Sequence, residues 1–291
     1  MANSLREVKI RIASTKATAQ ITKAMFMVSQ SKVKKAEKNY KAYKDFMSRI
    51  SSMVSQIVDK AKNDYTHPML QEREIKKTAY FVISSDRGLA GAYNSSIFKA
   101  LTEHINNNHK DNNEFITSAV GKKGYGYLKR MNYPLLNDRA KFVRDDVEFI
   151  DIKELADSLI NLYLEKKIDK LVIVYNHYVN SITQEVVFEQ LLPIKKIEGE
   201  QSSIDYIYES GLEKTIDLIL PMYALDVLYG TILDAKTAEH SARMNAMKSA
   251  TDNALEIIDK LQLLYNRARQ NVVTTELIDI IGGANAIGGD E

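Results

Sequence analysis

Apolar residues near both ends of the chain recur in alternating steps of three and four. In the C-terminal third this spacing runs through Met247, Ala250, Ala254, Ile257, Leu261, Leu264 and Ala268. Such spacing is typical of a coiled-coil seam, which is narrower than the apolar face of an ordinary surface helix. Between Pro221 and Gly282 the one helix-breaking residue is Gly230. The pattern therefore predicts a single long helix over residues 222–281.

The N-terminal segment has the same period and predicts a helix over residues 3–62. Residues 1–87 contain no glycine, and the first proline is Pro68. The seam passes through Val8, Ile12, Ala19, Phe26, Val33, Ala36, Tyr40, Tyr43, Met47, Ile50, Val54, Ile57 and Ala61. Two long helices with one period indicate an antiparallel coiled coil formed by the two ends of the chain, with a left-handed supercoil.

Polar residues interrupt both seams. Thr15, Thr22 and Ser29 occupy seam positions in the first helix, and Glu239 does so in the last. Polar seam residues either set the register of the helices or have a role beyond holding them together.

The middle of the chain predicts an α/β domain. Strands are expected at 78–84, 114–120, 134–143, 170–176, 182–191 and 204–208, and helices at 94–107, 122–131 and 152–167. Asn94 or Ser95 is the expected N-cap of the first of these helices. Alternation of strands and helices favours a mostly parallel, Rossmann-like sheet with one added antiparallel strand. The fold class is thus α/β, a long antiparallel coiled coil of the terminal helices plus a Rossmann-like domain inserted between them. The predicted domains are 1–67, 68–210 and 211–291, with a frayed tail from residue 282.

Composition excludes several classes of protein. Apolar residues make up 45% and charged residues 27% of the chain, as in a soluble globular protein, and no apolar run reaches the roughly 20 residues of a membrane span. Cysteine is absent, which excludes disulfides and thiolate chemistry. The net charge is +2, but residues 1–62 carry fourteen Lys or Arg against four acids. The first helix therefore favours an acidic partner.

Two glycine-containing segments are candidate binding loops. Residues 86–91 (DRGLAG) follow the first strand, where a dinucleotide loop would lie, but the full G-x-G-x-x-G pattern is missing. Residues 121–126 (GKKGYG) resemble the loop that holds RNA in KH domains, although a structural turn explains them equally well. A nucleic-acid-binding coiled coil and a degenerate Rossmann enzyme therefore stay open as alternatives. The five histidines have no ligand spacing, and no catalytic residue, cofactor site or metal ligand is predicted.

Five segments carry a resemblance to a known family. They are residues 21–28 (ITKAMFMV), 85–91 (SDRGLAG), 205–209 (DYIYE), 242–254 (ARMNAMKSATDNA) and 261–270 (LQLLYNRARQ), followed by Thr274 and Glu276. In this order and spacing, over the whole chain, the sequence resembles the γ subunit of rotary F-type ATP synthases. It departs from the family at Phe26, where an acid is usual, and at Ala90, where many members have cysteine.

The resemblance implies a non-catalytic rotor subunit. In the family the coiled coil stands inside a ring of three α and three β subunits, and the α/β domain is held on the membrane c-ring together with the ε subunit. Ion flow turns the c-ring and the shaft, which drives each β site through its binding states in sequence. Residues implied to contact β are Lys23, Met25, Arg243, Arg269, Gln270, Thr274 and Glu276. Residues implied to contact the c-ring and ε are Tyr206, Tyr208 and Glu209.

The expected location follows from the same resemblance. No transit-like segment precedes the first helix, which favours a bacterial source. A bacterial γ subunit works at the cytoplasmic face of the plasma membrane, with membrane contact through the c-ring alone. No nucleic acid and no cofactor are expected among its partners.

Overall fold

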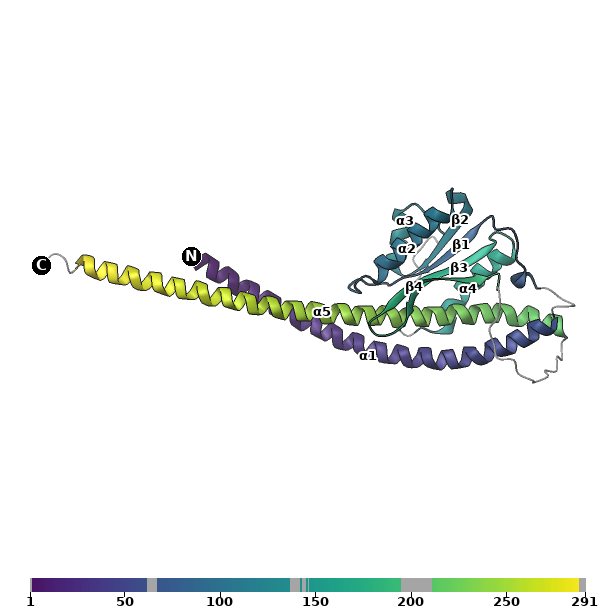
Figure 1. Ribbon diagram of the computed structural model, residues 1–291, viewed down its shortest axis with the longest axis horizontal. Helices are drawn as coiled ribbons and strands as arrows, with labels where there is room; N and C mark the ends of the chain where they lie inside the picture. Colours follow the sequence, from purple (N-terminus) through teal and green to yellow (C-terminus); the bar gives the residue numbers. More distant parts are fainter. Residues whose placement is uncertain are drawn as a thin grey trace. The chain divides into compact units, whose positions relative to one another are not determined.

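A computed structural model describes residues 2–61, 67–136, 142, 145, 147–194 and 211–287. The elements in chain order are α1 (Ala2–Ala61), η1 (Pro68–Leu70), β1 (Thr78–Ile83), α2 (Tyr93–Asn108), η2 (Asn112–Glu114), β2 (Phe115–Val120), α3 (Lys122–Arg130), α4 (Phe149–Leu164), β3 (Lys170–Tyr178), β4 (Gln184–Leu192) and α5 (Leu212–Ile287). Two long terminal helices with an α/β domain inserted between them confirm the predicted fold class (Figure 1).

The chain forms two compact units. One consists of the residues up to Val28 together with those from Met244 onward, and the other runs from Ser29 to Arg243. Helices α1 and α5 each contribute a segment to both units. The predicted domain boundaries after residues 67 and 210 lie next to segments outside the described residues, so they stay a prediction.

Helix α5 begins earlier and ends later than predicted. It starts at Leu212, so that Pro221 lies inside the helix, and it continues through Gly282 to Ile287. An interior proline removes a backbone hydrogen bond and costs roughly 3 kcal/mol. Ile216, Leu220 and Ala224 are all buried around it. The burial of these apolar side chains in the second unit offsets the cost of the proline.

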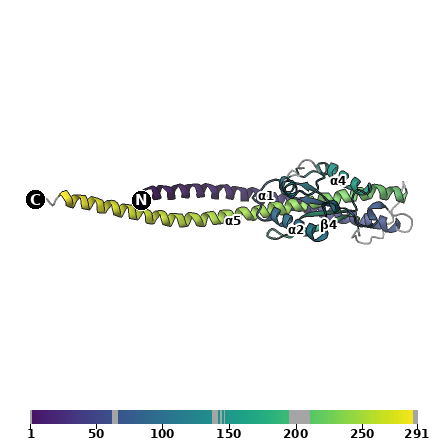
Figure 2. The same cartoon turned by 90° about the horizontal axis from the view of Figure 1, so that it is seen from above.

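In the unit that contains the chain ends, α1 and α5 pair through small and apolar residues. Ile12 and Ala19 of α1 and Met247 and Ala254 of α5 are buried, and Figure 2 shows the two helix segments alongside each other. The Thr251 hydroxyl donates to the Thr22 hydroxyl at 2.8 Å. The polar gap at Thr22 is therefore a direct contact between the helices.

The seam of α5 differs from the prediction at two positions. Ile257 and Leu264 are 47% and 51% exposed, whereas the neighbouring Ile258 and Tyr265 are half-buried. At each position two apolar residues stand side by side in the sequence, and a step of three or a step of four both fit the pattern. The twist of the helix decides between them.

The sheet has four strands in the order β2-β1-β3-β4. β1 is parallel to β2 and to β3, pairing Thr78 with Phe115 and with Lys170, while β4 is antiparallel to β3. This arrangement confirms a mostly parallel sheet with an added antiparallel strand. Most of the strand predicted over 134–143 lies outside the described residues, and its described part has one bridge, between Leu135 and Thr117. The strand predicted over 204–208 lies outside the described residues.

Alternate residues of the strands face opposite layers. Phe81 and Ile173 pack on the side of α4, α1 and α5, and Tyr80 and Val174 pack on the side of α2 and α3. Figure 1 shows α2 and α3 together on one side of the sheet. Because both faces of the sheet are covered, its central strands are almost wholly apolar.

The start of α2 and the hydropathy of α5 also differ from what the sequence predicts. No side chain caps α2, because the Asn94 side chain bonds instead to Ser85, accepting from its amide at 3.1 Å and donating to its hydroxyl at 2.7 Å. Helix α5 contains an 18-residue window of mean hydropathy 1.6, apolar enough to cross a membrane by length and composition. Half of that window is buried inside the protein, so core packing accounts for its apolar character.

Gly230 permits a close approach of α1 to α5 in the second unit. A Cβ atom at this position would lie 1.9 Å from the Tyr43 ring. The ring has little freedom to move, because the Tyr43 hydroxyl donates to the Asp226 carbonyl and the ring packs edge-on against Tyr229 at 5.7 Å between centroids.

We expect Gly230→Ala to lower the free energy of unfolding by about 1–3 kcal/mol, the usual cost of overpacking. Denaturant unfolding followed by circular dichroism measures this change. Gly126→Ala is the matched control, because a Cβ added at Gly126 would meet no atom within 4 Å, and it should leave stability unchanged or raise it by up to about 1 kcal/mol. Equal effects of the two substitutions would contradict the close approach.

Candidate functional site

Most residues implied to contact β lie on the surface of the unit that holds the chain ends. Lys23, Arg269, Gln270 and Glu276 are exposed. Thr274 is exposed as well, and its hydroxyl donates to the Gln270 carbonyl one turn earlier at 2.8 Å. These side chains point away from the seam and are accessible to a partner.

Met25 lies partly in the seam. It is half-buried, as is its neighbour Phe26, which stands where the family usually has an acid. An ionised side chain in Phe26's half-buried position would have to be desolvated or paired. The aromatic ring avoids that cost.

Arg243 is placed differently from the other implied contact residues. It is 9% exposed and belongs to the second unit. Its guanidinium donates to the Glu239 carboxylate at 2.8 Å and to the Arg87 carbonyl at 3.4 Å. Lys236 donates to the same carboxylate at 3.1 Å. Arg243 thus holds a loop of its own chain, and its contact with β stays a prediction.

The charge chain around Glu239 was not predicted from the sequence, in which Glu239 stood out only as a polar gap in a seam. Lys236, Glu239 and Arg243 are three and four residues apart, a spacing that places side chains next to one another on a helix. All three residues are buried. Buried charges of opposite sign that are hydrogen-bonded to one another avoid most of the desolvation cost of a lone charge.

The two glycine-containing loops meet each other in the structure. The carboxylate of Asp86 accepts from the amide of Lys122 at 3.0 Å, and the Ser84 hydroxyl accepts from the amide of Gly124 at 2.8 Å. The amide of Lys123 donates to the Ser85 carbonyl at 3.1 Å. Gly121 has φ +94°, and a Cβ there would lie 2.2 Å from the Ser84 carbonyl oxygen. The N-terminal amides of α3 are therefore already bonded to Ser84, Ser85 and Asp86, which disfavours phosphate binding by the 121–126 segment.

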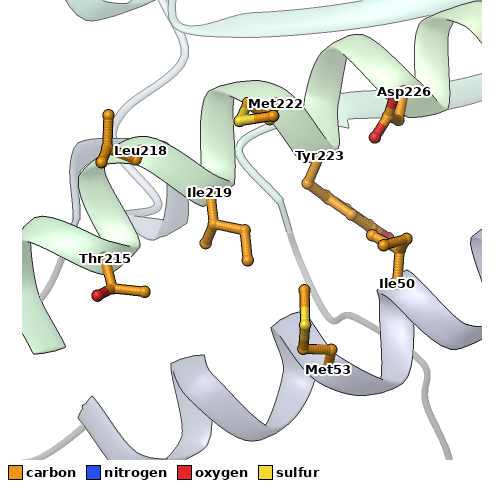
Figure 3. A pocket seen from close by; sticks show the side chains of 8 residues that line it. All are labelled: Ile50, Met53, Thr215, Leu218, Ile219, Met222, Tyr223 and Asp226. Carbon is orange, nitrogen blue, oxygen red and sulfur yellow. The ribbon is translucent and has the colours of Figure 1, made fainter. Parts of the chain in front are cut away.

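An apolar groove of about 340 Å³ opens between α1 and the start of α5 in the second unit. Figure 3 shows Ile50 and Met53 of α1 facing Ile219 and Tyr223 of α5 across it. On its rim Leu218 and Met222 are 68% and 62% exposed, so that apolar side chains continue from the groove onto the surface. Tyr206, Tyr208 and Glu209, the residues implied to contact the c-ring and ε, lie outside the described residues.

A second cavity of about 240 Å³ lies between α1, the sheet and α5, and Glu189 and Asp234 are among its lining residues. Burial raises the pKa of both carboxyl groups above their ordinary values. The Tyr175 hydroxyl donates to Glu189 at 3.1 Å. Within the described residues no group of three or more His, Cys, Asp or Glu is placed to hold a metal ion.

The architecture defines the class of protein. Two terminal helices pair with each other and carry an inserted α/β domain, and most of the implied contact residues point outward, as in a structural subunit that works through its partners. A family model described as ATP synthase matches residues 4–287. The chain therefore belongs to the γ-subunit family of F-type ATP synthase.

Solved structures share this fold. A central-stalk chain of the Tetrahymena thermophila mitochondrial ATP synthase is 24% identical with a TM-score of 0.60, over 79% of this chain and 99% of that chain. A chain of the Euglena gracilis mitochondrial enzyme in rotational state 3 is 18% identical with a TM-score of 0.68, over 99% of this chain and 96% of that chain. A chain from the Euglena gracilis rotor in rotational state 1 is 17% identical with a TM-score of 0.62, over 94% and 100%. At these identities the likeness concerns the fold.

His240 gives the charged part of α5 a pH dependence. Its side chain is 3% exposed and lies 3.7 Å from the Asp145 carboxylate. Burial lowers the pKa of His240 to about 4, which outweighs the opposing effects of Glu239 and Asp145. The folded state therefore binds the proton more weakly than the unfolded state. The stability contributed by neutral His240 is complete above about pH 6.5 and is lost as pH falls toward 4.

Below the pKa of the unfolded state, the free energy of unfolding of wild type should fall by about 1.4 kcal/mol per pH unit. Between about pH 7 and pH 5 we therefore expect wild type to lose about 2 kcal/mol more stability than His240→Gln. Denaturant unfolding of both proteins at each pH measures the difference. Glu189 and Asp234 titrate in both proteins and cancel in the comparison. A difference that does not change with pH would contradict a neutral, buried His240.

Proposed function

We propose that the chain is the central rotor subunit of an F-type ATP synthase, which couples ion-driven rotation of the membrane c-ring to ATP synthesis or hydrolysis in the α3β3 ring. The observation that carries this proposal is the pairing of the two chain ends around an inserted α/β domain, in a chain that the family model matches from residue 4 to residue 287. The structural neighbours come from a central stalk with its c-ring, an F1/c-ring assembly and a rotor.

The rotor acts by presenting a different surface to each β subunit as it turns. Each conformation of a β site then has its own contact free energy with the shaft, and rotation changes which conformation is favoured. Exposed side chains such as Lys23, Arg269 and Gln270 are suited to such contacts. The first helix, with fourteen basic and four acidic residues in 1–62, complements an acidic segment of β.

We infer that the chain is itself non-catalytic. The bonded amides of Lys122, Lys123 and Gly124 support this inference, because these three backbone donors of the 121–126 segment are already taken and cannot bind a phosphate. ATP chemistry then takes place in the β subunits. The same bonds weigh against the alternative of a nucleic-acid-binding protein that uses the 121–126 loop.

The α/β domain is proposed to contact the c-ring and ε through Tyr206, Tyr208 and Glu209. The apolar groove supports this proposal, because its exposed rim residues Leu218 and Met222 could contact a partner. They follow Tyr206, Tyr208 and Glu209 closely in the sequence. The proposed location is the cytoplasmic face of a bacterial plasma membrane.

The double substitution Arg269→Ala with Gln270→Ala tests the β contacts. Charged and bidentate contacts at a buried interface each contribute on the order of 1–3 kcal/mol, so we expect ATP hydrolysis by the reconstituted α3β3 complex to fall by about tenfold or more. Hydrolysis per assembled complex is the measurement, with the amount of bound γ determined by gel densitometry.

Lys99→Ala with Asn107→Ala is the matched control, because it removes the same kinds of group from the exposed face of α2. It should leave hydrolysis unchanged. If the chain ignored α and β but bound nucleic acid with a steep salt dependence, the rotor proposal would be wrong and the nucleic-acid alternative would stand.

A further inference from the structure

One segment of α5 is enclosed on every side, although it is rich in charge. Every residue from Thr231 to Ser241 is buried, and this stretch includes Asp234, Lys236, Glu239 and His240. An apolar sequence would fill such a position with less desolvation cost. The presence of so many polar groups calls for a role that apolar packing does not fulfil.

Asp234 is the most strongly bonded of these groups. It is 2% exposed, and one carboxylate oxygen accepts from the backbone amide of Tyr178 at 2.9 Å. The other oxygen lies 2.5 Å from the Nδ1 atom of His177. The Tyr40 side chain of α1 bonds to the same carboxylate. Asp234 therefore joins α5 to the end of β3 and to α1 together.

Other bonds reach α5 from different elements of the second unit. The Ser241 hydroxyl donates to the Ser181 carbonyl in the β3–β4 turn at 2.7 Å, and Arg243 donates to the Arg87 carbonyl in the β1–α2 loop. The Tyr93 hydroxyl of α2 donates to the Ala235 carbonyl at 3.0 Å.

These bonds leave the helix in different directions. At about 100° per residue, Asp234 and Ser241 lie on nearly the same side of α5, while Arg243 lies on the opposite side. The sheet and its turn therefore hold one side of the helix, and the β1–α2 loop holds the other.

Directional bonds resist a motion that apolar packing resists less. Apolar contact is non-directional and depends on the area removed from water, whereas a hydrogen bond weakens steeply when its angle changes. If α5 rotated about its own axis inside the domain, Asp234 and Arg243 would both be left as buried charges without their domain partners. The bonded arrangement therefore selects one rotational position of the helix.

We propose that these contacts form a rotational lock, a set of hydrogen bonds that prevents α5 from turning about its own axis within the α/β domain. Asp234 is the main positioning residue, and Ser241 and Arg243 add bonds to the β3–β4 turn and to the β1–α2 loop. Torque then passes between the α/β domain and α5 without slippage. This inference rests on the rotor function proposed above. It adds the residues that fix the helix within its own domain, none of which needs to touch another subunit for this purpose.

The test compares torsional stiffness in assembled complexes. The chain has no cysteine, so a single cysteine in place of Lys99, which is 79% exposed on α2, attaches a bead to the α/β domain while the α3β3 ring is fixed to a surface. We expect Asp234→Ala with Ser241→Ala to raise the variance of the bead angle during catalytic pauses at least twofold. Asp234→Asn keeps an acceptor oxygen for the Tyr178 amide and should stay close to wild type.

Glu103→Ala is the charge-matched control, because it also removes one carboxylate from the domain but from an exposed pair with Lys99. Because Lys99 is the partner of Glu103, this control and its wild-type reference carry the attachment cysteine at position 107 in place of Asn107. Glu103→Ala should leave the variance of the bead angle unchanged. His177→Ala removes one of three partners of Asp234 from a partly exposed position, and it should give a smaller increase even if the double variant fails to assemble.

The outcomes separate the two proposals. If the wild-type chain does not assemble with α and β or does not turn a bead, the rotor function itself is wrong. If wild type rotates, and the double variant or His177→Ala assembles with wild-type variance, the rotational lock is wrong while the rotor function stands.

Discussion

The structure depends on the antiparallel pairing of α1 with α5, two helices that each need the other to bury a narrow seam. Residues later in α1 contact residues earlier in α5: Thr22 bonds to Thr251, and Tyr43 bonds to Asp226. The whole α/β domain separates them in the chain. Because that domain is folded, it brings the ends of α1 and α5 together at far smaller entropic cost than a flexible loop of that length.

The pairing also explains why polar groups occur where a simple coiled coil would have none. In the unit that contains the chain ends, few residues of the seam are buried. There α1 and α5 pair through these residues and through the Thr22–Thr251 hydrogen bond. Within the second unit α5 is enclosed by α1, the sheet and the loops, and there buried charges such as Asp234 and Glu239 find fixed partners. One continuous helix is thus mostly exposed at one end and is a tightly bonded core element at the other.

Much of the fold was predictable because it depends on local periodicity. The seam of α1 and the buried strands β1 and β3 have strong patterns over many residues, and no neighbouring residue competes for the same position. The predictions that were wrong concern places where two local signals conflict. Pro221 predicts a helix start, yet the buried side chains of Ile216 and Leu220 carry α5 through it. Asn94 is a good capping residue, yet its side chain is needed to hold Ser85 in the preceding loop.

The sequence by itself determined the coiled-coil ends, the inserted α/β domain, the basic first helix and the family, because periodicity, composition and motif spacing are properties of neighbouring residues. Only the tertiary structure decided that Arg243 is held by its own chain, that Asp86 and Ser84 occupy the amides of α3, and that Asp234 bonds to β3 and α1. These partners are far apart in the sequence. Their pairing follows from the layering of helices on a sheet, which brings specific side chains together that no local pattern relates.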